Sequence, residues 1–185
     1  VMVNMELLKD IPFLDYFVTW QPSAAFGIRA GQFKTPISRQ FLLAPWKRAF
    51  VSSALAMAKF NLSRDVGVAV LGSFADKLLV YQLGVSNGTK MANTQDNTDL
   101  QFAGRLETHP LGPVPDVESA FTNPSKPLLS LGVAGAVNPL QISSENVQDD
   151  VITVVDVEGN QTTLEADLTF MWRRLFVTGE FFYRM

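Results

Sequence analysis

The chain has 185 residues, a formal net charge of −3 and a pI of about 5.1, which argues against a nucleic-acid-binding protein because such a domain is expected to be basic. It contains 0 cysteines, so a metal site built on thiolates is excluded. No stretch comes close to the ~18 consecutive apolar residues of a membrane helix. A structure that crosses a membrane would therefore have to be a β-barrel, the other architecture that pairs every backbone group within lipid.

Strand patterns run along the whole chain. Alternation of apolar and polar residues predicts about nine strands, each near the ~9–11 residues that a tilted membrane strand needs. In chain order they are residues 1–8, 13–20, 25–31, 65–73, 78–87, 100–107, 128–137, 163–173 and 175–184. Because the first and last patterns coincide with the ends of the chain, we expect residues 1–185 to be a single segment of a larger barrel.

The strand predicted at 163–173 has the clearest alternation. One face carries large apolar residues, and the other carries small or charged ones such as Glu165 and Asp167, with Met171 as the exception. The same division recurs at 128–137, where Leu and Val alternate with Ser, Gly and Ala. Periodicity alone fits both a soluble β-sandwich with a dry core and a barrel with a wet lumen.

The lengths of the connections favour the barrel. Short turns are predicted at 9–11, 22–24, 74–76 and 173–174, and long loops at 33–64, 88–99, 139–162 and, less regularly, 110–127. Outer-membrane barrels alternate short periplasmic turns with long external loops, and aromatic residues form girdles at both ends of their strands. We therefore predict an all-β fold, a transmembrane antiparallel β-barrel of which this chain is a part, with an inward-folded constriction loop.

The predicted constriction loop is residues 33–64. It contains Lys34, Arg39, Lys47, Arg48, Lys59 and Arg64, and no Asp or Glu. A basic loop in a narrow lumen of low dielectric constant attracts anions. The alternative is that these cations pair with carboxylates of the barrel strands and create a transverse field without anion preference; the candidate partners are Asp15, Glu107, Glu165 and Glu180.

Residues 139–162 are predicted to form an acidic external loop, since the region 127–172 contains no Lys or Arg. Gly159-Asn160 lies between β-branched runs and predicts a turn, so part of this loop could be a hairpin that projects beyond the sheet. Such a loop could bind divalent cations, or it could be a solvated acidic loop.

The sequence GVSNG at residues 84–88 matches the G-x-S-x-G nucleophile elbow, which suggests an outer-membrane hydrolase that uses Ser86 with His109 and either Asp96 or Asp99. The elbow requires a helix after the serine, whereas the residues that follow have the composition of a loop. A turn at the end of a strand accounts for the same residues. His109 is the single histidine, so no zinc or haem site is indicated.

An ordered set of motifs resembles the phosphate-selective porin O/P family of Gram-negative outer membranes. The motifs are GQFKTPISRQ (31–40), FNLSRDVGVAV (60–70), YQLGVSNG (81–88), FAGRLETHPLG (102–112), LSLGVAG (129–135) and VTGEFFYR (177–184). The resemblance implies a sixteen-stranded barrel, usually trimeric, with a loop folded into the lumen and arginines and lysines along the pore. This chain would be its middle portion. It departs from the family in that residues 41–60 are largely apolar between their charges and form no dense arginine ladder.

Together these observations predict a porin of the cell outer membrane for passive diffusion of small hydrophilic solutes, with anions or phosphate preferred. The residues predicted to line the pore and attract anions are Arg29, Lys34, Arg39, Lys47, Arg48, Lys59, Arg64 and Arg105. We expect no catalysis, cofactor, metal or nucleic acid; the expected partners are membrane lipid, lipopolysaccharide, small anions and the other subunits of a homotrimer. Three alternatives stay open: a plugged or scaffolding barrel that holds a partner protein, the Ser86 hydrolase, and a soluble β-sandwich binding module.

Overall fold

The computed structural model describes the backbone of residues 2–5, 15–50, 52, 54–88, 100–119, 122–148 and 151–185, and the side chains of these residues except 2–5 and 139–158. Its strands are β1 (Met2–Met5), β2 (Tyr16–Ser23), β3 (Phe26–Lys34), β4 (Arg64–Phe74), β5 (Leu79–Ser86), β6 (Gln101–Thr108), β7 (Leu128–Gln148), β8 (Val151–Trp172) and β9 (Leu175–Arg184). Its helices are α1 (Arg39–Leu42), the 3₁₀ turn η1 (Pro45–Lys47) and α2 (Leu55–Phe60).

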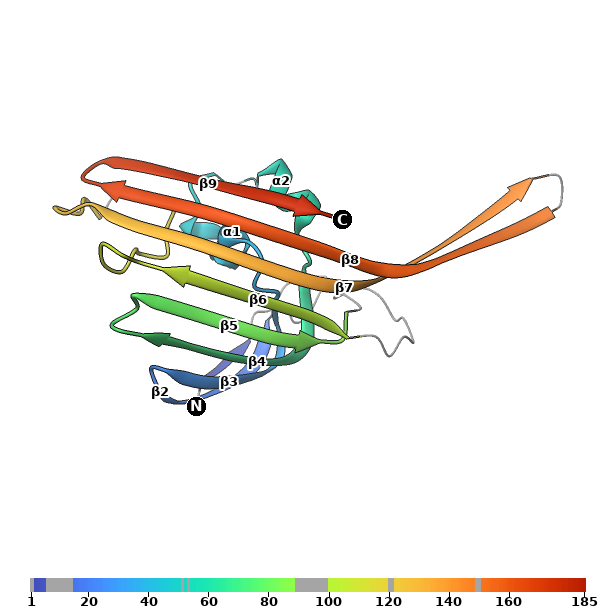
Figure 1. The fold of residues 1–185 in the computed structure, drawn as a ribbon, viewed down its shortest axis with the longest axis horizontal. Coiled ribbons are helices and arrows are strands. Elements are labelled where there is room, and N and C mark those ends of the chain that lie inside the picture. The colour runs from blue at the N-terminus through green and yellow to red at the C-terminus, as the bar shows by residue number, and fades with distance from the viewer. Residues whose placement is uncertain are drawn as a thin grey trace.

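The strands form one antiparallel sheet in which each strand pairs with its neighbour in sequence, from β1 to β9 (Figure 1). This confirms the predicted all-β antiparallel fold, and each described strand overlaps the range predicted for it, but β7 and β8 extend far beyond theirs. Among the described residues β9 does not pair back onto β1, so the sheet is open. None of the helices in the described ranges is long and apolar enough to cross a membrane.

The short predicted turns lie at one end of the sheet. Strands β2 and β3 are joined by residues 24–25, β4 and β5 by 75–78, and β8 and β9 by 173–174 (Figure 1). The longer connection 109–127 joins β6 to β7 at the same end, and the long segment 35–63 joins β3 to β4 at the opposite end. The predicted turn at 9–11 and most of the predicted loop at 88–99 lie outside the described residues.

The sheet has an apolar face that is exposed and a polar face that is covered. On β7 the exposed residues include Val133, which is 56% exposed, whereas Ser130 on the other face is 0% exposed. On β8 the exposed Leu168 alternates with the buried Asp167 and Thr169. Met171, the exception to the alternation in the sequence, lies on the covered face. A soluble domain normally shows the opposite arrangement, with the apolar face buried.

The region from 139 to 162 is paired strand rather than the predicted loop. Strands β7 and β8 continue as a two-stranded ribbon beyond β6 and β9, with pairs from Asn138↔Gln161 to Gln148↔Val151 (Figure 1). The predicted turn at Gly159-Asn160 is wrong, because these residues pair with Leu140 and Pro139 inside the ladder. The β-branched residues on both sides of them favour continued pairing. Residues 149–150 lie outside the described residues, and the projecting hairpin is the alternative that the pairing of β7 with β8 bears out.

Candidate functional site

The segment 35–63 lies over the covered face of the sheet and is anchored there by α1. Ser38 caps this helix: its Oγ accepts a hydrogen bond from the Phe41 amide at 3.1 Å and donates one to Glu180 Oε2 of β9 at 2.8 Å. The backbone N–H of Gln40 donates to Glu180 Oε1 at 2.6 Å. One strand carboxylate thus holds the first turn of α1, whose amides have no partner within the helix.

A second anchor holds the other end of the segment through α2. Arg184 of β9 donates to the carbonyl oxygens of Lys59 at 3.1 Å and Phe60 at 2.6 Å. These carbonyls belong to the C-terminal turn of α2, where a cation is favoured. The Phe60 ring also stacks on Phe182 with 5.2 Å between ring centroids. The segment is therefore tied to β9 at two places, near its beginning and near its end.

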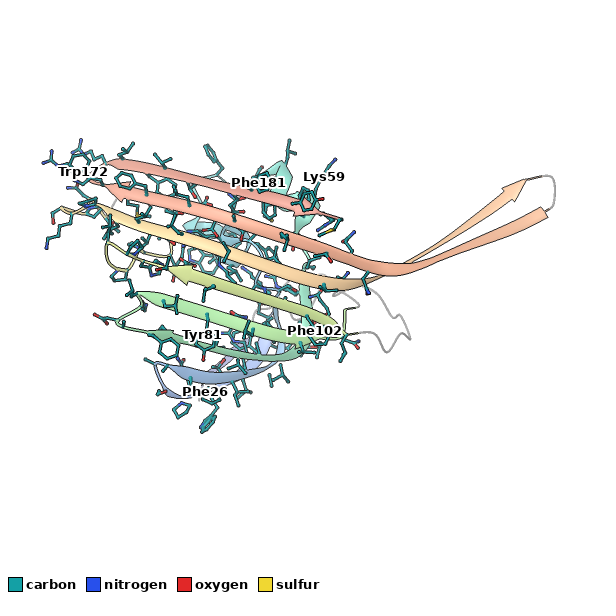
Figure 2. All side chains as sticks on the ribbon, viewed as in Figure 1. Phe26, Lys59, Tyr81, Phe102, Trp172 and Phe181 are labelled. Atoms are coloured by element: carbon teal, nitrogen blue, oxygen red, sulfur yellow. The ribbon has the colours of Figure 1, made fainter. Side chains whose placement is uncertain are left out.

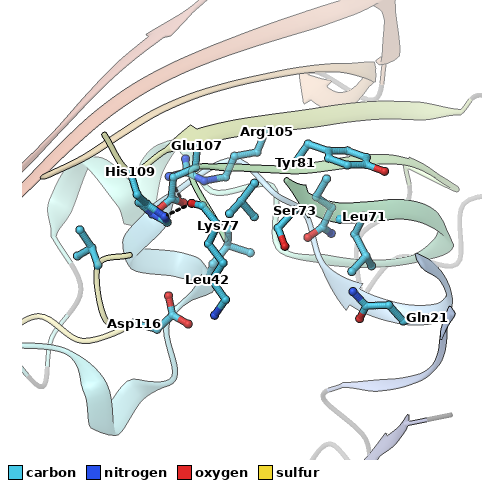
Figure 3. Close-up of a pocket in the computed structure, with 14 residues that line it drawn as sticks. Gln21, Leu42, Leu71, Ser73, Lys77, Tyr81, Arg105, Glu107, His109 and Asp116 are labelled. Atoms are coloured by element: carbon cyan, nitrogen blue, oxygen red, sulfur yellow. Dashed lines mark hydrogen bonds and ion pairs between the residues drawn. The ribbon is translucent and has the colours of Figure 1, made fainter. Parts of the chain in front are cut away.

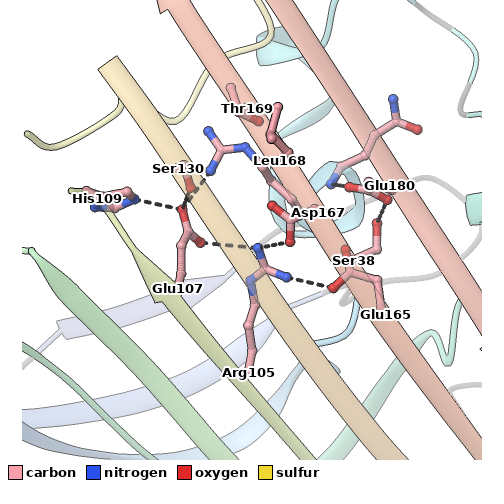
Figure 4. Close-up of polar contacts among 12 residues, drawn as sticks. Ser38, Arg105, Glu107, His109, Ser130, Glu165, Asp167, Leu168, Thr169 and Glu180 are labelled. Carbon is pink, nitrogen blue, oxygen red and sulfur yellow. Dashed lines mark hydrogen bonds and ion pairs between the residues drawn. The ribbon is translucent and has the colours of Figure 1, made fainter. Parts of the chain in front are cut away.

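Between the anchors lies a cluster of charged residues around Arg105 (Figure 4). From β6 this side chain reaches over β7 to β8, where it contacts Glu165 Oε2 at 2.9 Å and Asp167 Oδ2 at 2.6 Å. The strand register places Glu107, Gly132, Asp167 and Glu180 side by side in one row across β6, β7, β8 and β9. At Gly132 a Cβ atom would overlap the Asp167 carboxylate and the Arg105 guanidinium. The absence of a side chain at this position is what lets the guanidinium cross β7.

Glu107 is the second centre of this cluster. Its Oε1 accepts hydrogen bonds from Arg39 Nη1 at 2.8 Å and Ser130 Oγ at 2.7 Å, and it lies 2.8 Å from His109 Nε2. Its Oε2 is 3.3 Å from Arg105 Nη2. Arg39 also donates to the Pro115 carbonyl at 3.2 Å. The Glu107 carboxylate thereby joins α1, the sheet and the 109–127 connection.

The connection 109–127 contributes a further carboxylate that the sequence reading did not single out. Glu118 accepts hydrogen bonds from Gln40 Nε2 at 3.0 Å and from the Ala49 amide at 2.9 Å. It is only 6% exposed, although it lies in a segment without regular structure. Its position ties the segment 35–63 to the short-turn end of the sheet.

A cavity of about 260 Å³ lies between these segments and the sheet (Figure 3). Leu42 and Asp116 line it from the covering segments, whereas Tyr81 and Glu107 line it from the sheet. His109 lies at its edge with Nδ1 at 2.7 Å from the Lys77 carbonyl oxygen. The covered face is thus hollow in part, with charged and apolar residues around the space.

The predicted site residues do not form one basic surface. Arg39 and Arg105 meet at Glu107, as described above. Arg64 of β4 makes a two-pronged ion pair with Asp15, with distances of 3.0 and 3.2 Å. The alternative of pairing with strand carboxylates therefore holds for these three arginines in the structure.

The other predicted cations have different neighbours. Arg29 donates to Thr19 Oγ1 at 3.2 Å, and its guanidinium lies 4.3 Å from the centre of the Phe17 ring. Lys34 donates to the Leu43 carbonyl at 3.1 Å, and Arg48 to the Gln40 carbonyl at 3.1 Å. The side chains of Lys47 and Lys59 are exposed. Arg29 and Lys34 line a second cavity of about 280 Å³, together with Asp15, Phe17, Phe33 and Trp46.

The residues proposed for a hydrolase are not brought together. Ser86 lies opposite Gln101 at the start of β6, whereas His109 follows Thr108 at its end. At about 3.3 Å per strand residue this places the two more than ~20 Å apart. His109 contacts Glu107 instead, and Ser86 accepts a hydrogen bond from Gln101 Nε2 at 3.3 Å. Asp96 and Asp99 lie outside the described residues.

Comparison with family models, with curated proteins and with solved structures finds no match for this chain. The function of the site therefore has to be argued from its own geometry.

Proposed function

We propose that this chain is part of an outer-membrane β-barrel through which small hydrophilic solutes diffuse passively. The observation that carries the proposal is the inverted distribution of residues over the two faces of the sheet. Lipid-facing strand residues of a membrane barrel are apolar and lumen-facing residues are polar. The exposed Leu131, Val133 and Leu168 and the covered Ser130 and Asp167 follow this rule.

The positions of the exposed aromatic residues support the same proposal. Phe26 and Trp172 lie beside the short turns, and Phe102 and Phe181 lie toward the other ends of their strands (Figure 2). Two levels of aromatic residues on an apolar face correspond to the girdles at the two interfaces of a membrane. An apolar surface of this extent would otherwise need a protein partner.

The remainder of the barrel would close the sheet at its two open edges, β1 and β9. Closure is needed in lipid because an unpaired strand edge leaves backbone groups without hydrogen bonds. A sixteen-stranded trimer, as the resemblance to porin O/P proteins implies, is our proposal for the complete assembly. In it the segment 35–63 is the constriction loop.

The anion preference in this proposal rests on fewer residues than the sequence suggested. Arg39, Arg64 and Arg105 are each paired with carboxylates, so their fields are largely cancelled. We assign the preference to Arg29 and Lys34, because they line a cavity beside β3, and to the exposed loop lysines Lys47 and Lys59. The expected preference is therefore mild.

Single-channel conductance of the complete protein in a planar bilayer, with a reversal potential measured under a salt gradient, tests the proposal. Discrete conductance steps with an anion-favouring potential are the expected result. Steps without anion preference would keep the channel and remove the role of the β3 and loop cations. Absence of steps from a protein that inserts as a folded barrel would contradict the channel.

A plugged or scaffolding barrel is the second candidate, favoured by the way the segments 35–63 and 109–119 fill part of the covered face. Arg39, Gln40 and Glu118 link the two segments to each other. A protein partner that co-purifies in a fixed ratio with a non-conducting barrel would favour this candidate. A soluble β-sandwich would instead be stable without detergent, with its apolar face covered by a second sheet.

A further inference from the structure

Two buried carboxylates on β8 each keep one oxygen without a hydrogen-bond partner. The side chains of Glu165 and Asp167 are both 0% exposed, and each gives one oxygen to Arg105. Glu165 Oε1 and Asp167 Oδ1 have no partner. Residues two apart on a strand lie on the same face, so the two carboxyl groups are neighbours. Two adjacent carboxylates out of contact with water cannot both be ionised without a large cost in free energy.

The elements around the pair supply too little positive charge for two ionised carboxylates. Strand β6 contributes Arg105 and Glu107, and β7 contributes only Gly132 and Ala134 at the facing positions. Strand β9 adds the carboxylate of Glu180 opposite Asp167, and its Arg184 donates to Thr163 and to the carbonyls of Lys59 and Phe60 instead of to the pair. The segment 35–63, which covers this face of the sheet, reaches Glu180 through the neutral donors Ser38 and Gln40. Its Arg39 binds Glu107.

His109 accounts for one further positive charge near Glu107. Both of its ring nitrogens lie at hydrogen-bond distance from acceptors, 2.7 Å from the Lys77 carbonyl and 2.8 Å from Glu107 Oε1. A carbonyl oxygen and a carboxylate only accept, so both contacts are hydrogen bonds when each ring nitrogen carries a hydrogen. The cluster then has Arg39, Arg105 and His109 against the carboxylates of Glu107, Glu165, Asp167 and Glu180.

We propose that Glu165 and Asp167 share one proton and form a buried proton-binding site beneath the constriction loop. The proton is taken from water when the chain folds; it forms an O–H bond with one carboxyl group and a hydrogen bond with the facing oxygen of the other. It gives both unpartnered oxygens a partner. It also leaves the cluster with equal numbers of positive and negative charges.

A metal ion does not account for the same observations. Within the part of the chain that the structure describes, no group of at least three His, Asp or Glu side chains is arranged to hold one. The two carboxyl groups have no exposed surface through which a hydrated ion could reach them. The inference concerns the protonation of the pair and does not depend on the channel proposed above.

The shared proton couples pH to the covering segment. Asp167 is the register neighbour of Glu180, which holds the first turn of α1. Loss of the proton in alkali would place a second negative charge beside Glu180 and raise the free energy of this anchored arrangement. We therefore expect the barrel to lose stability in alkali in a way that depends on this pair.

Infrared difference spectroscopy of the complete protein in lipid at neutral pH tests the inference. The carbonyl stretch of a protonated carboxyl group is expected in the wild-type protein. It is expected to disappear in Glu165→Gln, whose amide can donate to Asp167 in place of the proton, and in Asp167→Asn, where the remaining Glu165 faces Arg105 alone. The control is Glu118→Gln, which removes a buried carboxylate outside the Arg105 cluster with partners for both oxygens and should keep the band.

Absence of the band from wild-type protein at neutral pH would overturn the inference without any variant. A band that survives in both Glu165→Gln and Asp167→Asn would overturn it as well. A second readout is unfolding at neutral and alkaline pH. Glu165→Gln should be as stable as wild type at neutral pH and should lose most of the alkaline destabilisation; an unchanged alkaline loss in this variant would contradict the shared proton.

Discussion

Arginines serve different purposes in the two halves of the covered face. On β3 and β4, Arg29 and Lys34 line a cavity together with Asp15, and Arg64 pairs with the same carboxylate. On β6 to β9, Arg105 is enclosed by Glu107, Glu165 and Asp167. The first group has an excess of positive charge, and the second has none. Residue type alone therefore does not reveal which arginine is enclosed by carboxylates.

Because Arg105 is more deeply buried than Arg64, its replacement is expected to cause the largest loss of stability. Arg105→Met would leave Glu165 and Asp167 buried without their cation, and we expect a loss of about 3–5 kcal/mol in the free energy of unfolding, the range for breaking a buried ion pair. Arg64→Met removes the partner of Asp15, but that pair retains some exposure, with side chains 16% and 12% exposed. For this matched variant we expect a loss of only about 1 kcal/mol. Urea unfolding of the folded protein in lipid vesicles measures both, and equal losses would contradict the contrast.

The lack of space for a side chain at Gly132 predicts the next largest loss of stability. Gly132→Ala places a methyl group where the Asp167 carboxylate and the Arg105 guanidinium meet, so we expect a loss of about 2–3 kcal/mol from overpacking and a displaced ion pair. Gly179→Ala is the control, since a Cβ at this position of β9 meets nothing within 4 Å. It should be neutral or slightly stabilising. The same urea titration reports both, and a tolerated alanine at 132 would show that the guanidinium does not need this crossing.

These two positions also show what the sequence could and could not predict. Alternation placed Glu165, Asp167 and Arg105 on the polar face correctly, because the period of two is a local property. That Glu107, Gly132, Asp167 and Glu180 fall in one row depends on the register of strands far apart in the sequence, which no local pattern specifies. The role of Gly132 became visible only with that register.

The wrong prediction of a turn at 159–160 has a similar cause, because pairing between strands decided the outcome. Gly159-Asn160 is a turn signal by residue type, yet continued pairing of β7 with β8 overrides it. The sequence leaves open whether the arginines of the segment 33–64 attract anions or pair with carboxylates, and in the structure Arg39 and Arg64 are paired. The carboxylates that pair with them come from β6 and from Asp15, and their proximity is a result of tertiary folding. Glu118 had no distinguishing signal, because its partners Gln40 and Ala49 lie on a different connection.

The α1 anchor predicts a smaller effect on the covering segment itself. Glu180→Gln replaces a carboxylate that accepts from the Gln40 amide and Ser38 Oγ, so these bonds lose their charge assistance. We expect a loss of about 1–2 kcal/mol, confined to the loop anchor. A spin label at Ala44 should become more mobile in this variant. An unchanged spectrum, with urea stability also unchanged, would show that α1 is held by its other contacts.

The smallest expected effect is on ion selectivity, and it concerns the exposed side of the covering segment. Lys47→Gln combined with Arg48→Gln removes two positive charges without touching the Arg105 cluster. Because the Lys47 side chain is exposed, its field is screened over a Debye length of ~8 Å at physiological salt, so we expect the anion-to-cation permeability ratio to fall by no more than about twofold. The comparison pair is Arg29→Gln with Lys34→Gln on β3, where the charges line a cavity and are less screened. Reversal potentials in planar bilayers should shift more for the β3 pair than for the loop pair. A larger shift for the loop pair would place the selective part of the channel on the covering segment, whereas no shift for either would mean that neither group of cations acts on permeating ions.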